Sequence, residues 1–177
     1  MLVFDASTLI LIAKAEMLDL FLDPVELPIA IPLEVQKECC GVKKPLDALM
    51  IQKALDESRI RAVTVKDKKL VTKLQEDFAL GRGEAEAIAL ALAERAHLLG
   101  IDDKNGINAC KLLGVAFATA LGILVRMQEK GIVTTNEARV KLATLGKYGR
   151  YKHSILEAAR RQLEKPDDKD DEYTNGS

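Results

Sequence analysis

The segment 1–15 reads MLVFDASTLILIAKA, and the order of its residue types decides the fold class. Residues 2–4 form a short apolar run that ends on Asp5. The stretch from Ser7 to Ala15 then has the apolar spacing of a helix, with Ser7 or Thr8 near its cap. The pattern predicts a buried strand that delivers an acidic residue to the start of a helix.

The same strand-then-helix order recurs along the chain. Further strands are predicted at 29–31, 61–65, 97–101 and 115–117, and further helices at 33–40, 66–78, 84–95, 104–113, 119–130, 134–146 and 151–163. This alternation predicts an α/β fold, a three-layer α/β/α sandwich with a central parallel sheet of about four to five strands. In such sheets the ligand crevice lies outside the carboxyl ends of the strands.

The composition is that of an ordinary globular domain. The chain has 177 residues, of which 48% are hydrophobic, and only 4% are aromatic, so aliphatic side chains must build the core. The three cysteines (Cys39, Cys40 and Cys110) have no spacing typical of a disulfide framework or a zinc site. Charges interrupt the apolar N-terminal run before it could cross a membrane. We therefore expect reduced thiols, a cytoplasmic location and no membrane association.

Charge is distributed unevenly towards the C-terminus. The net charge is −1, but residues 141–164 carry a local charge of +4 and residues 165–177 a local charge of −3. The expected division is a main domain over 1–146, a basic helical extension over 147–164 and an acidic, disordered tail over 165–177. The basic stretch is either a solvated helix face or an RNA contact.

Acidic residues are expected to converge at one edge of the sheet. Asp5 and the pair Asp102 and Asp103 follow predicted strands, and Glu38 and Glu84 lie on helices that could lean over the same edge. Carboxylates held close together repel unless a cation or protons neutralise them. Mg²⁺ and Mn²⁺ prefer such oxygen ligands, and the chain has only two histidines. The chemistry that suits this set is metal-assisted hydrolysis of a phosphodiester bond.

Four segments, VFDASTLI, IPLEVQKE, GRGEAEAIALA and IDDKNGINA, resemble the PIN-domain family in their order and separation. The resemblance covers about residues 1–130 and is closest to small prokaryotic members of the VapC toxin type. It implies a parallel sheet sandwiched by helices and an endoribonuclease dependent on Mg²⁺ or Mn²⁺. It places the family's acids on Asp5, Glu38, Glu84 and the Asp102/Asp103 pair, with metal held by all of these except Glu38. It also implies a toxin held inactive by a small antitoxin protein, and a homodimer.

Simpler interpretations exist for each of these residues. Asp5 could only cap a helix, Ser7 could be a cap or support a bound water or phosphate, and Asp102 and Asp103 could form a turn. The resemblance selects Glu38 over Glu34, and Glu86 is expected at the surface. Lys104 contacts either phosphate or solvent, and Arg82, between two glycines, is the better candidate for a phosphate contact.

Two other functions are compatible with the same sequence. The chain could be a non-catalytic RNA- or protein-binding module that keeps the fold, although intact acids at all four positions argue against that. An aspartyl phosphatase would need a second Asp two residues after Asp5, where this chain has Ser7.

Overall fold

The computed structural model describes residues 1–41 and 45–164, so the expected acidic tail at 165–177 lies outside the described residues. Five parallel strands form one sheet in the order β3-β2-β1-β4-β5. The strands are β1 (Leu2–Phe4), β2 (Ile29–Pro32), β3 (Arg61–Val63), β4 (Leu98–Gly100) and β5 (Phe117–Ala118). The predicted parallel α/β architecture is confirmed.

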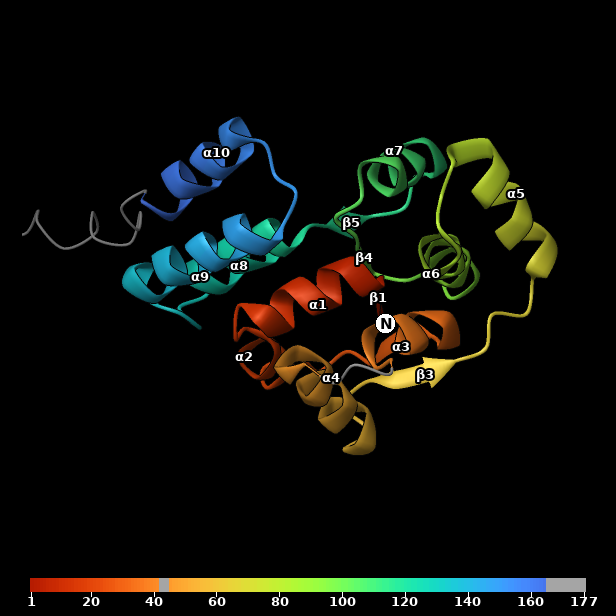
Figure 1. Ribbon diagram of the computed structural model, residues 1–177, viewed down its shortest axis with the longest axis horizontal. Coiled ribbons are helices and arrows are strands. Elements are labelled where there is room, and N and C mark those ends of the chain that lie inside the picture. The colour runs from red at the N-terminus through yellow and green to blue at the C-terminus, as the bar shows by residue number, and fades with distance from the viewer. Residues whose placement is uncertain (42–44, 165–177) are drawn as a thin grey trace, which may run out of the picture.

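Helices cover both faces of this sheet. They are α1 (Ala6–Lys14), α2 (Leu18–Leu22), α3 (Leu33–Cys39), α4 (Leu46–Asp56), α5 (Lys68–Phe78), α6 (Arg82–Ala93), α7 (Lys104–Leu113), α8 (Ala120–Glu129), α9 (Thr135–Tyr148) and α10 (His153–Leu163). Figure 1 shows α5, α6 and α7 together on one side of the molecule and α8, α9 and α10 together on the other.

The two faces of the sheet have separate hydrophobic cores, because successive strand residues point to opposite faces. In β1, Leu2 and Phe4 pack in the core formed with α1, α2, α4, α8, α9 and α10. Val3, between them, packs in the core formed with α5, α6 and α7. All three are buried, as expected for a strand at the centre of a parallel sheet.

Several element boundaries differ from the sequence-based prediction. Helix α1 begins at Ala6 and its N-cap is Asp5, not Ser7 or Thr8. Helix α6 begins at Arg82, two residues before the predicted start, and α10 begins at His153, two residues after it. Strand β5 covers Phe117–Ala118 rather than 115–117. Helices α2 and α4 have no counterpart among the predicted elements.

Other local predictions are confirmed. Helix α7 covers the predicted residues, and Thr134 and Glu137 form the predicted capping box at the start of α9. That helix continues to Tyr148, past the predicted end near Gly146. Within the described residues, no helix combines the length and the apolar character needed to span a membrane.

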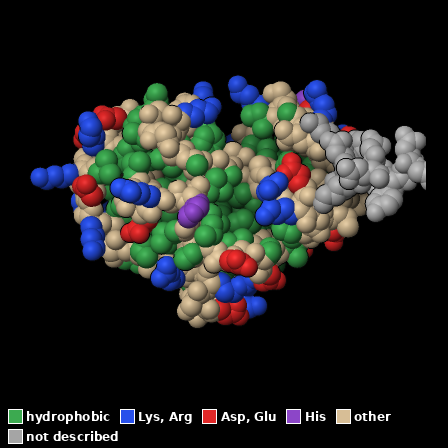
Figure 2. Space-filling model, turned by 180° about the vertical axis from the view of Figure 1, so that it is seen from behind, with side chains coloured by type: hydrophobic (Ala, Val, Ile, Leu, Met, Phe, Trp, Pro, Cys, Tyr) green, Lys and Arg blue, Asp and Glu red, His purple; other side chains and the backbone are tan. Residues whose placement is uncertain are grey.

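The surface seen from behind carries charges of both signs. Figure 2 shows hydrophobic side chains in the middle of this face, with Lys, Arg, Asp and Glu side chains spread around them. The positive charges on this face are therefore dispersed among acidic and apolar groups, as on an ordinary protein surface.

Candidate active site

The starts of four helices converge at the carboxyl edge of the sheet, and an acidic side chain lies at each. Asp5 follows β1 and caps α1, whereas Asp103 follows β4 and caps α7. Glu84 lies in the first turn of α6, and Asp102 accepts a hydrogen bond from the Ala120 amide at the start of α8. The positive end of each helix dipole favours negative charge at this edge.

Asp5 is completely buried, and its carboxylate is held by its own helix. Its Oδ1 accepts a hydrogen bond from the Thr8 amide (2.8 Å), and its Oδ2 accepts one from the Ser7 hydroxyl (2.7 Å). Desolvation outweighs these bonds and, with a smaller contribution from the nearby charge of Asp102, raises the pKa of Asp5 to about 7. The capping interpretation of Asp5 is therefore correct, but a cap alone does not account for a carboxyl group that titrates near neutrality.

Asp102 is linked to Asp5 through Thr8. The Thr8 hydroxyl donates to Asp102 Oδ2 (2.8 Å), which also accepts the Ala120 amide (2.9 Å). The Tyr151 hydroxyl donates to the other oxygen, Asp102 Oδ1. Burial is the largest effect on Asp102 and raises its pKa, while these three hydrogen bonds oppose the shift. Two desolvated carboxyl groups thus lie next to each other.

Asp103 and Glu84 each use one carboxylate oxygen to cap a helix. Asp103 Oδ1 accepts the amides of Asn105 (2.7 Å) and Gly106 (2.9 Å). Glu84 Oε2 accepts the Gly81 amide (2.9 Å). Burial raises the pKa of Glu84, and the charge of Asp103 contributes to this rise. The second oxygen of each carboxylate makes no hydrogen bond within the described part of the chain.

A pocket of about 510 Å³ opens at this edge. Five of the predicted site residues line it, namely Ser7, Glu84, Asp102, Asp103 and Lys104. Asp5 does not line the pocket, because it is buried behind Ser7, to which it is hydrogen-bonded. The remaining lining residues are Ile10, Leu11, Lys14, Tyr148, Gly149 and Arg150.

Glu38 lies beside this pocket, against the start of α6. A Cβ atom added to Gly83 would be 2.3 Å from Glu38 Oε1, so only glycine at this position lets the carboxylate come so close. Burial raises the pKa of Glu38, the charges of Glu34 and Glu84 raise it further, and the amide of Gly83 opposes the rise. Glu34, the alternative to Glu38, instead pairs with Lys37 at 3.3 Å. The charge of Glu84 thus acts on the pKa of Glu38.

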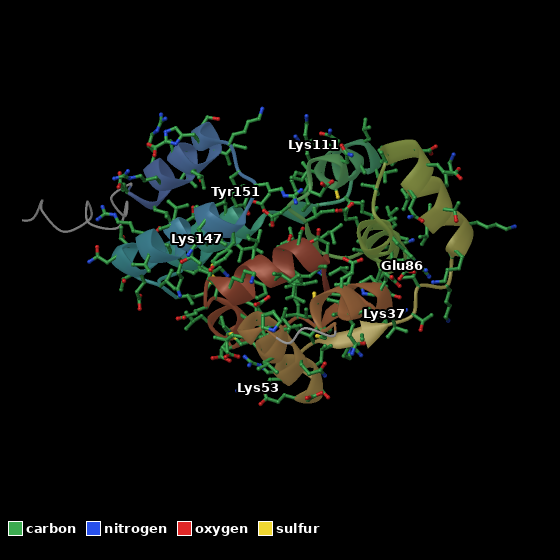
Figure 3. The ribbon with its side chains drawn as sticks, viewed as in Figure 1. Lys37, Lys53, Glu86, Lys111, Lys147 and Tyr151 are labelled. Atoms are coloured by element: carbon green, nitrogen blue, oxygen red, sulfur yellow. The ribbon has the colours of Figure 1, made fainter. Side chains whose placement is uncertain are left out.

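The expectation that Glu86 is a surface residue is wrong. Its exposed fraction is 3%, and its Oε1 pairs with Lys68 (3.1 Å) and Arg82 (3.4 Å). Figure 3 shows Glu86 on α6, on the side of the molecule that carries α5. Arg82, the predicted phosphate contact, pairs with Glu86 and lies 3.8 Å from Glu34, and it is not among the residues that line the pocket.

Several site residues were not identified from the sequence. Thr8 links the two buried acids, and Tyr151 and Arg150 come from the segment between α9 and α10. A Cβ atom on Gly149 would lie 2.2 Å from the Tyr151 ring, so this glycine allows the ring to pass close to the backbone on its way to Asp102. In the sequence, the position of Gly149 between two tyrosines in the segment 147–152, KYGRYK, could have indicated this close approach.

The donor atoms fit a hard divalent cation in their chemistry. They are all oxygens, and burial raises the pKa values of Asp5, Asp102 and Glu84, so a cation would offset the cost of their charged forms. The side chains do not form a finished cage, however. Across residues 1–41 and 45–164, no group of three or more His, Cys, Asp or Glu side chains is arranged to hold a metal ion.

The comparisons with known proteins give one family. The family DUF3368, described as a PIN domain, matches residues 1–165. No curated protein and no solved structure matches the chain significantly.

Proposed function

The chain belongs to the PIN-domain family, and on that premise we propose that it is an endoribonuclease that depends on Mg²⁺ or Mn²⁺ and hydrolyses phosphodiester bonds of RNA. PIN domains are generally nucleases that use divalent metal ions. The observation that carries the finer proposal is the pocket itself. Its lining combines acidic and hydroxyl side chains with basic ones. The former are Ser7, Glu84, Asp102 and Asp103, and the latter include Lys104 and Arg150.

The acids divide into two groups by their environment. Asp102, Asp103 and Glu84 line the pocket and would hold the cation, and Asp5 would complete this set from the buried side next to Ser7. When bound, such a cation would lower the pKa of a water and offset negative charge on the reacting phosphate. The buried Asp5 carboxylate would bind a cation best in its charged form, which predominates above its pKa of about 7.

The remaining residues orient these acids and attract the substrate. Ser7 and Thr8 fix the Asp5 carboxylate by donating to its two oxygens, and Thr8 also donates to Asp102. Lys104 and Arg150 bring positive charge to the lining, where they would attract the phosphate groups of RNA. Among the described residues that line the pocket there is no Cys or His, and the Ser7 hydroxyl is held by Asp5, so we propose direct attack by water without a covalent intermediate.

The proposal is tested by Asp5→Asn. The amide oxygen of Asn can still accept the Thr8 hydrogen bond and cap α1, while the negative charge is lost. We expect cleavage of single-stranded RNA with Mn²⁺ or Mg²⁺ to fall about a hundredfold or more, without loss of folding by circular dichroism.

The matched control for this variant is Asp67→Asn. Asp67 is also a helix N-cap, accepts the Leu70 amide and is outside the pocket. It should cleave RNA like the wild type. Undiminished cleavage by Asp5→Asn would contradict the site, and failure of the wild type to cleave RNA with either metal would contradict the function.

The likeness to VapC toxins supports a narrower proposal about biological context, in which the chain is a toxin controlled by a small antitoxin protein. Expression should then arrest cell growth, and co-expression of the partner should relieve the arrest. Harmless expression of a chain that cleaves RNA in vitro would remove the toxin role and leave the nuclease proposal intact.

A further inference from the structure

The structure assigns Tyr148 as a stacking platform for one unpaired base of single-stranded RNA, with basic side chains beside it for the backbone phosphates. This inference rests on the proposed function and adds a binding residue to it. Tyr148 is the last residue of α9, is 50% exposed and lines the same pocket as Asp102, Asp103 and Glu84. A half-exposed aromatic ring beside a candidate active site is the feature that requires explanation.

The position of the ring suits a strand that passes through the site. A second, smaller hollow of about 180 Å³ shares Lys14 and Tyr148 with the acidic pocket. The ring therefore borders both hollows. A base stacked on Tyr148 would have its neighbouring nucleotide in the acidic pocket, where the phosphodiester bond would meet Asp102 and Asp103. Only an unpaired base offers a free face to such a ring.

Two ammonium groups lie over the ring, and one of them, Lys14 Nζ, is also paired with Asp47 Oδ1 at 3.1 Å. The Nζ atoms of Lys14 and Lys147 lie 5.0 Å and 5.3 Å from its centroid, and Arg150 lines the pocket two residues further along. Figure 3 shows Lys147 on α9 and Tyr151 in the segment that leads to α10. Aromatic rings interleaved with cations are typical of surfaces that bind single-stranded nucleic acid, because the ring holds a base and the cations hold its phosphates.

Lys147 and Arg150 are better placed for phosphate than Arg82, whereas Lys14 already pairs with Asp47. Within the described residues, Lys147 and Arg150 have no acidic partner at ion-pair distance, whereas Arg82 lies near both Glu34 and Glu86. A cation already paired with carboxylates has less to gain from a phosphate group. The phosphate contacts therefore belong to the end of α9 rather than to the start of α6.

The chain has no Trp, so the substitution Tyr148→Trp introduces a single tryptophan emitter at the proposed platform. The variant is titrated with a short single-stranded oligouridylate in EDTA, which prevents metal-dependent cleavage. We expect its emission to be quenched with the same apparent Kd that fluorescence anisotropy of labelled RNA gives. An abasic strand of the same length should bind through its phosphates but quench much less, because it has no base to stack.

Matched controls separate stacking from general effects. Leu112→Trp places the emitter on α7 at a position that is 78% exposed and outside the pocket, and its emission should not respond to RNA. Tyr148→Ala should weaken RNA binding roughly tenfold, whereas Tyr148→Phe should retain it, since stacking needs the ring and not the hydroxyl. Lys147→Ala should weaken binding more than Lys111→Ala, because Lys111 lies on α7 away from the platform (Figure 3).

The outcomes distinguish this inference from the proposed function. Unchanged emission of Tyr148→Trp while RNA binds, equal quenching by the abasic strand, or wild-type affinity of Tyr148→Ala would overturn the platform. Cleavage of RNA by the wild type with Mn²⁺ in that case leaves the nuclease proposal standing. Base-dependent quenching without any cleavage supports the platform and removes the nuclease proposal, and a wild type that does not bind RNA overturns both.

Discussion

At the scale of single residues, the central fact is that Asp5 is buried beside another buried acid. Its two oxygens accept hydrogen bonds from Ser7 and Thr8, yet desolvation still raises its pKa from 3.8 to about 7. The folded state therefore binds a proton on Asp5 over a pH range in which the unfolded chain has lost it. The charge of Asp5 is costly because its carboxylate is completely buried, and this cost is what a bound cation would offset.

The free energy of unfolding should change with pH over the range that this pKa sets. Because the folded pKa lies above the unfolded value, the metal-free protein should lose stability as pH rises from about 4 to about 7 and change little above that range. For Asp5, this loss in the free energy of unfolding is on the order of 4 kcal/mol. Urea denaturation in EDTA at pH 5 and pH 8 measures roughly 2–3 kcal/mol of this loss, because the rest occurs below pH 5, and Asp5→Asn should show a smaller loss. An equal loss in Asp5→Asn would mean that other groups cause the pH dependence.

At the scale of elements, the start of α6 is shaped around the side chain of Glu38. Gly83 lies in the first turn of this helix, and Glu38 on α3 packs against it where a Cβ atom would otherwise be. The atoms that a Cβ would meet are the end of a flexible side chain, not backbone. A small residue at 83 is thus needed for the position of Glu38 and not for the helix itself.

The variant Gly83→Ala separates these two roles. Alanine favours helix by up to about 1 kcal/mol over glycine, so the variant should be as stable as the wild type or slightly more stable. It should also push the Glu38 carboxylate away and lower RNA cleavage to the level of Glu38→Gln. Gly122→Ala on α8 is the matched control, since its Cβ would have only an ordinary contact with Thr119 at 3.6 Å. Full cleavage by Gly83→Ala would show that the placement of Glu38 does not matter for the reaction.

At the scale of the whole molecule, four helices and two strands bring their acids to one edge, and burial raises the pKa of four of these acids. They are Asp5, Glu38, Glu84 and Asp102. All four shifts have the same sign, so each favours the protonated form in the absence of a cation. Protons therefore compete with a divalent ion for these carboxylates, and the affinity of the site for the ion should rise with pH.

Thermal unfolding with and without Mn²⁺ tests this property of the whole site. Mn²⁺ should raise the Tm at pH 8 and do so much less at pH 5.5, because protons compete for the carboxylates at the lower pH. Asp67→Asn should keep the full shift and Asp5→Asn should reduce it. A protein whose Tm is unaffected by Mn²⁺ at both pH values would instead fit the non-catalytic binding module.

The sequence by itself determined the parallel α/β fold and the order of its acids. Hydrophobic alternation and local turn chemistry depend on neighbours in the chain, so the apolar run before Asp5, the helix after Asp103 and the capping box of Thr134 and Glu137 were all predictable. Boundaries moved by a residue or two where a cap was misassigned, as at Asp5. The short helix α2 and the helix α4 lacked such a signal in our interpretation.

Only the tertiary structure decided how the acids are used and what surrounds them. It gave Asp102 partners from three distant segments and left Asp103 to cap its own helix, a distinction that two adjacent aspartates cannot reveal. It also buried Glu86 between Lys68 and Arg82. These outcomes depend on contacts between elements that are far apart in the chain, and packing of whole helices fixes such contacts, whereas local pattern fixes only the elements themselves.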